Sequence, residues 1–277
     1  MRWTTARFDI DLNQPKVMAI INVTPDSFSD GGQFDDVTAA MRQCEQVIKD
    51  GAHILDIGGE STRPGSPAVP LAQELERVLP VVREAVKLNV PVSVDTYKPE
   101  VMRAVLDLGA DIVNDIWALR RGDAMQVVAR HPRCGVCLMH MYRDPQTMQV
   151  APMDGDVVAP VKAFLTERAQ MLEAMGVARE RIALDPGIGF GKTVQQNFSL
   201  LARQAELCGL PYPWLVGWSR KSSLGAVTGR DRPADRVAAS VAAALLAVER
   251  GALVVRVHDV RETVDAISVR HSVSKCS

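Results

Sequence analysis

Residues 51–56 read GAHILD, and the same pattern returns as GADIVN at 109–114 and as GALVVR at 251–256. Each copy starts with a glycine, which suits the left-handed end of a helix, and a short run of strand length then ends in a polar or charged side chain. The apolar runs along this chain are continuous rather than alternating, which is typical of strands buried on both faces. The repeat therefore predicts helices that alternate with the parallel strands of one sheet.

Eight such strand–helix pairs follow one another along the chain. The predicted strands are 17–21, 53–57, 90–94, 110–113, 135–139, 181–184, 213–217 and 252–257, and the predicted helices are 36–50, 71–88, 98–108, 122–131, 157–175, 195–207, 234–250 and 260–269. Eight pairs favour a closed α/β fold, a single (β/α)8 TIM barrel of about 250 residues, over an open doubly wound sheet. We expect this barrel over 15–270, an N-terminal extension at 1–14 that lies as a short lid under the barrel floor, and a C-terminal tail at 271–277.

The composition excludes several classes of protein. The chain has 277 residues with 32 basic and 33 acidic side chains, a formal net charge of −1, and 47% apolar residues. Such a chain is neither disordered nor surrounded by the positive field that non-specific nucleic-acid binding needs. The longest strongly apolar stretch runs only from 237 to 248, whereas a membrane-spanning helix needs about 20 residues. The first nine residues lack an apolar core, so we expect no signal peptide.

The cysteines indicate a reducing compartment. Five is an odd number, and a chain of this size needs no disulfide staples, so a cytoplasmic location fits best. Cys134 and Cys137 have the spacing of a redox or metal pair, but no second Cys/His pair stands at zinc-finger spacing, and Cys137 falls inside a predicted strand. We therefore expect buried thiols.

A polar side chain closes every predicted strand. These residues are Asn22, Asp56, Asp95, Asn114, His140, Asp185, Ser219, and Arg256 with His258. In a barrel the carboxyl ends of all strands meet on one face, where the active site lies. The sequence therefore predicts a polar site at this end of the barrel.

Three loops and the last strand supply the chemistry of that site. The loop at 22–32 is rich in Ser, Asp and Gly, and its composition alone fits a plain surface connection. The loops 58–66 (GGESTRPGS) and 217–225 (GWSRKSSLG) combine hydroxyl groups with cations between glycines, which favours an anion site. Arg256 and His258 are two residues apart, so they share one face of a strand. Any one of these charges alone is most simply a solvated side chain, but together they indicate a phosphate or carboxylate site.

Two other motifs suggest a nucleotide site and a metal site, but their surroundings do not fit. Residues 187–193 (GIGFGKT) end like a nucleotide-binding P-loop, but Pro186 stands where that motif needs glycine. We interpret the stretch as a glycine turn that places Asp185 and Phe190 over the barrel mouth. His140 has no second histidine nearby, so we do not assign it to a metal cluster.

The predicted site is therefore mixed. Asp95, Asn114 and Asp185 suit a heterocycle that presents an N–H and amino edge, and the cations at the rim suit a diphosphate. Asn22 together with a phosphate oxygen could complete a Mg²⁺ shell made largely of water.

Several long stretches resemble one family, the dihydropteroate synthases of the pterin-binding barrel enzymes, and the bacterial form in particular. The stretches are 17–32 (VMAIINVTPDSFSDGG), 56–65 (DIGGESTRPG), 93–99 (SVDTYKP), 114–116 (NDI), 184–192 (LDPGIGFGK), 219–222 (SRKS) and 256–260 (RVHDV). They span about residues 15–265 in the right order. Trp117 departs from the family pattern, which usually has a smaller or polar residue there, and it alters the expected pocket edge.

The resemblance implies an activity (EC 2.5.1.15) and a role for each matching residue. The enzyme joins 6-hydroxymethyl-7,8-dihydropterin diphosphate to 4-aminobenzoate and releases diphosphate, forming 7,8-dihydropteroate for folate synthesis. The pterin residues are Asp95, Asn114, Ile116, Met139, Asp185, Phe190, Gly217 and Lys221. The diphosphate residues are Asn22, Thr62, Arg63, Arg256 and His258, with Mg²⁺ on Asn22. The 4-aminobenzoate residues are Phe28, Thr62, Pro64, Phe190, Lys221 and Ser222. The catalytic residues are Asp95, Lys221, Arg256 and His258.

The resemblance also implies sulfonamides as competitors and a homodimer. Three alternatives stay open. A methyltetrahydrofolate-dependent methyltransferase of the same barrel family would share the acids but would not need the loops at 61–65 and 219–222. A Schiff-base aldolase would use Lys221, and a non-catalytic pterin-binding relative would have lost rim residues.

Overall fold

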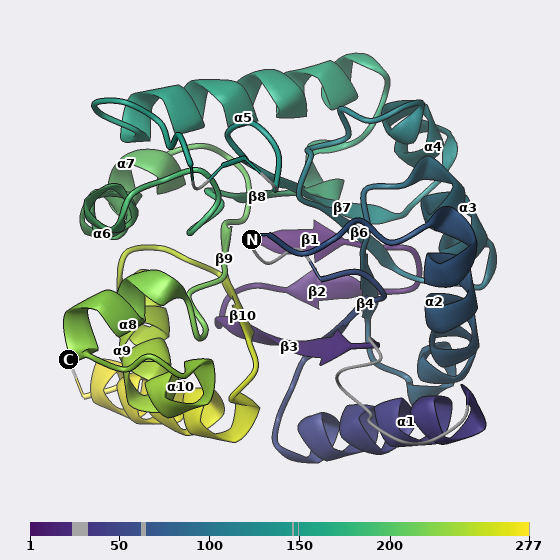
Figure 1. The fold of residues 1–277 in the computed structure, drawn as a ribbon, viewed down its shortest axis with the longest axis horizontal. Coiled ribbons are helices and arrows are strands. Elements are labelled where there is room, and N and C mark those ends of the chain that lie inside the picture. Colours follow the sequence, from purple (N-terminus) through teal and green to yellow (C-terminus); the bar gives the residue numbers. More distant parts are fainter. Residues whose placement is uncertain (24–32, 62–64, 146, 149, 277) are drawn as a thin grey trace.

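The computed structural model describes residues 1–23, 33–61, 65–145, 147–148 and 150–276, and its central feature is a ring of eight parallel strands (Figure 1). The strands are β3 (Lys16–Asn22), β4 (Ile54–Gly58), β5 (Val92–Asp95), β6 (Ile112–Asp115), β7 (Gly135–Met139), β8 (Ile182–Asp185), β9 (Leu215–Val216) and β10 (Val254–Val257). They pair in the order β8-β7-β6-β5-β4-β3-β10-β9. The prediction of a (β/α)8 barrel is confirmed, and each strand overlaps the apolar run that predicted it.

The ring closes weakly between β8 and β9. These two strands are joined by a single bridge between Leu184 and Trp214, beside a hydrogen bond of 2.9 Å from the Leu184 N–H to the Pro213 carbonyl. Because β9 has only two residues, it offers little backbone for a longer ladder.

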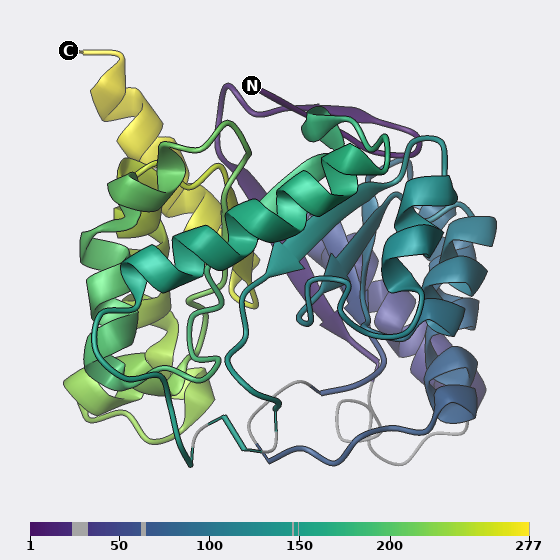
Figure 2. The same cartoon turned by 90° about the horizontal axis from the view of Figure 1, so that it is seen from above.

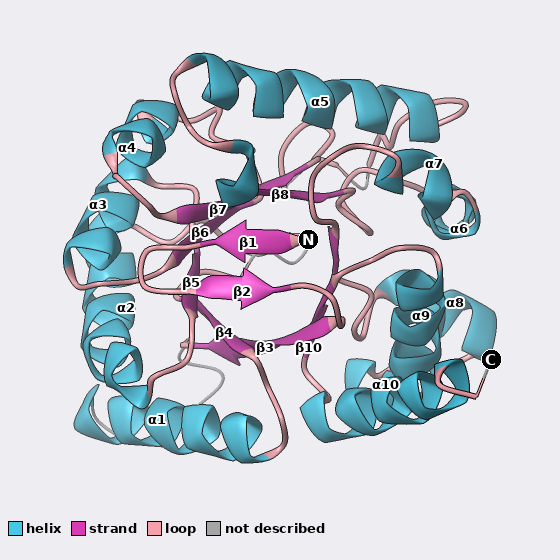
Figure 3. Ribbon diagram, turned by 180° about the vertical axis from the view of Figure 1, so that it is seen from behind, coloured by secondary structure: helices cyan, strands magenta, loops and turns pink. Residues whose placement is uncertain are grey.

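Helices cover the outside of the ring, as Figure 3 shows from behind. They are α1 (Gln33–Lys49), α2 (Leu71–Ala85), α3 (Pro99–Asp107), α4 (Ala124–Arg130), α5 (Val158–Ala174), α6 (Val194–Ala202), α7 (Gln204–Cys208), α8 (Ser222–Thr228), α9 (Val237–Glu249) and α10 (Val260–Ser274), with short 3-10 helices at Val86–Leu88, Arg179–Arg181 and Pro233–Arg236. Their apolar faces and the strands enclose the main core.

Three helix predictions need correction. The predicted helix at 195–207 is split at Arg203 into α6 and α7, because Arg203 leaves the helical backbone conformation. Helix α8 occupies part of 217–225, where a loop was expected. Helix α10 continues to Ser274, so the expected boundary between barrel and tail at 270 falls inside it.

A hairpin of β1 (Arg2–Thr4) and β2 (Asp9–Asp11) lies across one end of the barrel (Figures 2 and 3). Trp3 is fully buried there, and it packs with Ile10 and Leu12 against the side chains that fill the barrel floor, namely Met18, Ile54, Ile112, Cys137, Ala183, Leu215 and Val254. The Trp3 indole N–H donates a hydrogen bond of 3.0 Å to the Arg181 carbonyl. The N-terminal extension therefore covers the amino ends of the strands.

Cys134 and Cys137 are buried free thiols, as expected, and Cys44, Cys208 and Cys276 are free as well. Within the described part of the chain, no helix is both long and apolar enough to cross a membrane.

Candidate active site

A cavity of about 500 Å³ lies at the carboxyl ends of the barrel strands. Every predicted site residue that the structure describes lines it: Asn22, Asp95, Asn114, Ile116, Met139, Asp185, Phe190, Gly217, Lys221, Ser222, Arg256 and His258. The remaining ones, Phe28, Thr62, Arg63 and Pro64, lie outside the described residues. The barrel thus brings together residues that are up to 236 positions apart (258 − 22).

Arg256, which lines the cavity, lies between two carboxylates. The Nε atom of Arg256 lies 2.6 Å from Oδ2 of Asp56, and its Nη2 atom lies 2.7 Å from Oδ2 of Asp95. Asn114 donates a hydrogen bond of 3.2 Å from Nδ2 to the same oxygen of Asp56. The sequence placed Arg256 at the rim among the cations, whereas the structure ties it to the acids of the central strands.

Burial and the neighbouring charges shift the pKa values of Arg256 and Asp95 in opposite directions. Burial opposes the charge of Arg256, but the Asp56 and Asp95 carboxylates raise its pKa above the usual value, so it stays protonated. Burial raises the pKa of Asp95 to about 7, although Arg256 favours the ionised form. A small change at Arg256 can therefore change the charge of Asp95 near neutral pH.

Asp185 is oriented by the glycine turn that follows it. The Gly187 N–H donates a hydrogen bond of 2.7 Å to Oδ1 of Asp185. Burial raises the pKa of Asp185 to about 6, opposed by that N–H and by the nearby cations Lys221 and Arg256. Gly187 has φ +68°, and a Cβ there would lie 1.8 Å from the His140 carbonyl oxygen, so only glycine allows this close approach.

Lys192 lies beneath the same turn. Its Nζ atom contacts the Gly187 carbonyl at 2.8 Å, the Phe190 carbonyl at 3.1 Å and Nδ1 of His140 at 3.0 Å. Burial lowers the pKa of Lys192 to about 7. Burial, together with Lys192, lowers the pKa of His140 to about 2, so the imidazole is neutral and accepts the hydrogen bond.

One wall of the cavity is apolar. Ile116, Met139 and Phe190 belong to one buried cluster with Met141 and Met148. Nζ of Lys221 lies 4.4 Å from the centre of the Phe190 ring, within the range of a cation–π contact. This wall suits a planar ring, and the lysine gives it a charged edge.

The opposite rim holds His258 in a fixed orientation. The Ser219 hydroxyl oxygen accepts a hydrogen bond of 3.1 Å from the His258 backbone N–H and lies 3.0 Å from Nδ1 of the same ring. A hydroxyl group has one proton and two acceptor sites, so Ser219 can hold Nδ1 of His258 in either tautomer. Arg220 has φ +59° and forms an ion pair of 2.5 Å with Asp259.

Sequence reasoning missed several of these residues as members of the site. Asp56 and Ser219 were noted as strand ends and Arg220 as a cation of the 217–225 loop, but none of them received a role. Arg236 lines the cavity unpredicted. Asp56 and Arg256 are 200 positions apart, so no local pattern could pair them. The register of β10 against β3 and of β3 against β4 is what brings them together.

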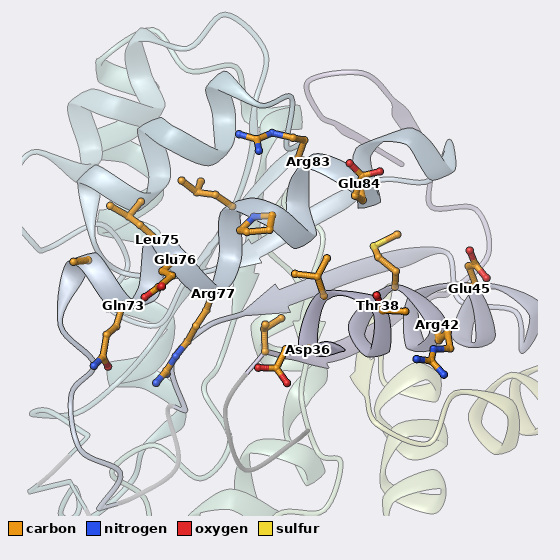
Figure 4. Close-up of a pocket in the computed structure, with 16 residues that line it drawn as sticks. Asp36, Thr38, Arg42, Glu45, Gln73, Leu75, Glu76, Arg77, Arg83 and Glu84 are labelled. Carbon is orange, nitrogen blue, oxygen red and sulfur yellow. The ribbon is translucent and has the colours of Figure 1, made fainter. Parts of the chain in front are cut away.

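Two further hollows lie away from the strand ends or at their margin. A groove of about 1240 Å³ runs between α1 and α2 (Figure 4), with Val37, Met41, Leu75 and Leu79 among its lining and Arg42, Glu45, Arg83 and Glu84 along it. It is larger than the cavity, but none of the polar strand ends points into it. A hollow of about 310 Å³ beside the cavity is lined by Tyr97, Trp117 and Arg121. Trp117 therefore does stand at the pocket edge.

Asn22 is the residue expected to hold a metal. Within the described ranges, no group of three or more His, Cys, Asp or Glu side chains is placed to hold one. The Asn22 side chain lines the cavity and makes no hydrogen bond to another described residue, so its amide oxygen can serve as one ligand. Mg²⁺ commonly takes one or two protein oxygens and completes its shell with water and substrate phosphates, and the site fits that pattern.

A family described as pterin binding enzyme matches residues 18–258. The dihydropteroate synthase of Neisseria meningitidis serogroup B is 47% identical over 272 residues, which cover 96% of this chain and 95% of that protein.

Two solved structures are similar over nearly the full chain. A Xanthomonas albilineans dihydropteroate synthase with 4-aminobenzoic acid has a TM-score of 0.93 at 49% identity and covers 99% of both chains. A Burkholderia cenocepacia dihydropteroate synthase complexed with 7,8-dihydropteroate has a TM-score of 0.91 at 52% identity, with 99% of this chain and 97% of that one covered.

Proposed function

This chain belongs to the dihydropteroate synthase family of pterin-binding enzymes, and we propose that its cavity joins 6-hydroxymethyl-7,8-dihydropterin diphosphate to 4-aminobenzoate. The products are 7,8-dihydropteroate and diphosphate. The single observation that carries the proposal is the cavity itself, in which acids, an apolar wall and cations from all parts of the barrel converge.

The pterin ring occupies the inner part of the cavity. Asp95, Asn114 and Asp185 present acceptors to the N–H and amino edge of the ring, and these side chains are nearly fully buried. Ile116, Met139, Phe190 and Gly217 shape the slot, while Lys221 adds a donor at its edge. Hydrogen bonds in such a water-poor site gain strength because water competes little for them.

The diphosphate lies toward Asn22, Arg256 and His258. Arg256 uses Nε and Nη2 for the two carboxylates, and Nη1 makes no hydrogen bond to another described residue, so it can donate to a phosphate oxygen. His258 is a second donor, through Nε2–H when Nδ1 accepts from the Ser219 hydroxyl. Thr62 and Arg63, outside the described residues, would complete this subsite. A magnesium ion held by Asn22 and the diphosphate would neutralise part of the leaving-group charge.

The reaction starts with the departing diphosphate. The C–O bond to the pterin methylene breaks, and its electron pair leaves with the diphosphate, whose charge Arg256 and His258 stabilise. The ring delocalises the resulting cation, and ionised Asp95 provides a fixed negative charge beside it. The neutral aniline nitrogen of 4-aminobenzoate then forms the C–N bond and loses one proton. No strong base is required, because an uncharged arylamine is already nucleophilic.

The 4-aminobenzoate lies over Phe190, with its carboxylate toward Lys221 and Ser222. Phe28, Thr62 and Pro64, which lie outside the described residues, would close this subsite. Sulfonamides resemble 4-aminobenzoate in shape and charge, so they compete for the same place. Competition is measured as a rise in the KM for 4-aminobenzoate at unchanged kcat.

The assembly and the location of the protein are part of the proposal. Exposed apolar side chains on α8, α9 and α10 support a homodimer, namely Val227, Leu246, Val269 and Val273. Light scattering on the eluting protein tests it, with a mass near twice 30.2 kDa expected. Five free cysteines support a cytoplasmic location.

The function is tested by a coupled assay for diphosphate release with and without 4-aminobenzoate. We expect release that depends on both substrates and a product that absorbs as dihydropteroate. A methyl transfer from methyltetrahydrofolate without diphosphate release would favour the methyltransferase. Trapping of a substrate on Lys221 by borohydride would favour the aldolase, and pterin binding without turnover would favour the non-catalytic relative.

A further inference from the structure

Lys192 is a buried lysine to which the reaction above assigns no role. Its side chain is almost fully buried, and its Nζ atom has three acceptors within 3.1 Å: the carbonyl oxygens of Gly187 and Phe190 and Nδ1 of His140. Three acceptors match the three N–H donors of an ammonium group. Because a buried polar group is costly unless it is hydrogen-bonded, these acceptors favour an amino group at this place.

The groups that Lys192 binds belong to a turn that shapes the pterin slot. The turn begins after Asp185, whose carboxylate accepts the Gly187 N–H, and it carries Phe190, whose ring contacts Lys221. The other anchor is His140, at the end of strand β7, whose ring also packs edge-on against Phe164 with 5.1 Å between ring centres. Lys192 thus joins the turn to the strand that carries Met139.

The outer side of the turn is held separately. The side chain of Asn197 on α6 accepts the Gly189 N–H at 2.8 Å and donates to the Lys192 carbonyl at 3.3 Å and to the Ser223 hydroxyl at 3.0 Å. Asn197 therefore fixes the turn against the helices, whereas Lys192 fixes it against the barrel. Loss of Lys192 releases the inner side, on which Asp185 and Phe190 face the cavity.

We propose that Lys192 is a positioning residue for the pterin pocket, whose amino group ties the Gly187–Phe190 turn to the end of β7 and so sets where Asp185 and Phe190 meet the ring. Lys192 lies behind the lining of the cavity and acts through the turn. The inference rests on the proposed function for the identity of the ring, and it adds a determinant of pterin affinity that does not touch the substrate.

A matched control exists at the other end of the barrel. Arg181 is also a buried cation, and it donates to the carbonyl oxygens of Cys134 at 2.8 Å, Val128 at 3.0 Å and Pro132 at 3.3 Å. These contacts lie at the amino ends of the strands, far along the barrel from the cavity. If Lys192 only supported the fold, Lys192→Met would behave like Arg181→Met, with lower stability and normal pterin affinity.

The experiment compares wild type, Lys192→Met and Arg181→Met. Each protein is titrated with 6-hydroxymethyl-7,8-dihydropterin diphosphate by calorimetry, after circular dichroism has established the folded fraction. We expect Lys192→Met to lose affinity at least about tenfold, the factor for one hydrogen bond to a charged group, and Arg181→Met to stay within about twofold. The KM for this substrate should rise in parallel. A Lys192→Met affinity equal to that of the control overturns the proposal.

A second variant covers the case in which Lys192→Met does not fold. His140→Phe keeps the ring packing against Phe164 and removes one acceptor of the ammonium group, and we expect a loss of pterin affinity of about threefold or more. Unchanged affinity there overturns the proposal as well. A wild-type protein that binds the pterin but releases no diphosphate would contradict only the proposed function, because the binding comparison would still stand.

Discussion

Replacing Arg256 with methionine removes the cation that two buried carboxylates share. Arg256 contacts Asp56 at 2.6 Å and Asp95 at 2.7 Å, and methionine fills much of the same volume without a donor. Two effects follow from this structure. The leaving diphosphate loses a charged donor, and Asp95 loses the charge that favours its ionised form.

The missing donor to the diphosphate sets the size of the decrease in kcat/KM. A hydrogen bond to a charged group is worth about 1.5–3 kcal/mol, so kcat/KM should fall by about 10- to 150-fold. The two carboxylates also lose their shared cation, which lowers the free energy of unfolding by about 3–5 kcal/mol for a broken buried ion pair. The assay therefore normalises the rate to the folded fraction.

The change at Asp95 makes the decrease in activity depend on pH, and the decrease should be smaller at high pH. Burial already raises the pKa of Asp95 to about 7 while Arg256 opposes it, so removal of Arg256 raises this pKa further. Less of the carboxyl is then ionised at neutral pH. If ionised Asp95 stabilises the pterin cation, the variant should recover part of its kcat as the pH rises from 7 to 9, and wild type should gain less.

The measurement is kcat/KM from diphosphate release between pH 6 and 9. Arg261→Ala is the matched control, because Arg261 pairs with Asp50 on the exposed surface of α10 and such pairs contribute little. The control should retain wild-type kcat/KM. An Arg256→Met variant within about twofold of wild type at pH 7, with the same pH profile, would refute the assignment of Arg256 to the leaving group.

Three further predictions concern other parts of the molecule. Asp185→Asn should weaken pterin binding at least about tenfold by calorimetry, and an affinity equal to that of wild type would contradict the role of Asp185 in holding the ring. Because burial raises the pKa of Asp185 to about 6, the substitution should also raise the melting temperature more at pH 8 than at pH 4. Asn22→Ala should raise the Mg²⁺ concentration needed for half-maximal diphosphate release, and an unchanged Mg²⁺ requirement would argue against a ligand at this position. Trp3→Ala should lower the free energy of unfolding by about 3–5 kcal/mol in a denaturant titration, because the ring is fully buried at the barrel floor. The KM should not change, and a changed KM would show that the hairpin reaches the active site.

The ring of strands could be predicted because each strand carries its own signal. Continuous apolar runs are long enough to stand out, and glycines such as Gly51, Gly109 and Gly251 end the preceding helices with positive φ. Helix α8 could not be recognised, since Ser222, Ser223 and Gly225 are poor helix formers and tertiary contacts decide their conformation. The hairpin of β1 and β2 gave no signal beyond its few apolar residues, and only the open barrel floor explains its place.

The candidate site could be predicted as a set of residues but not as a set of contacts. Polar strand ends and loop cations identified the lining of the cavity, because barrel topology sends all strand ends to one face. The pairing of Arg256 with Asp56 depends on strand register, and the burial of Lys192 depends on how the glycine turn folds back on β7. Neither follows from spacing along the chain.

A crystal structure of the protein with a bound pterin would show where the ring lies. We predict that the ring lies in the cavity with its N–H and amino edge between Asp95, Asn114 and Asp185 and its methylene toward Arg256 and His258. A ring bound anywhere else, or with that edge turned toward the cations, would contradict it.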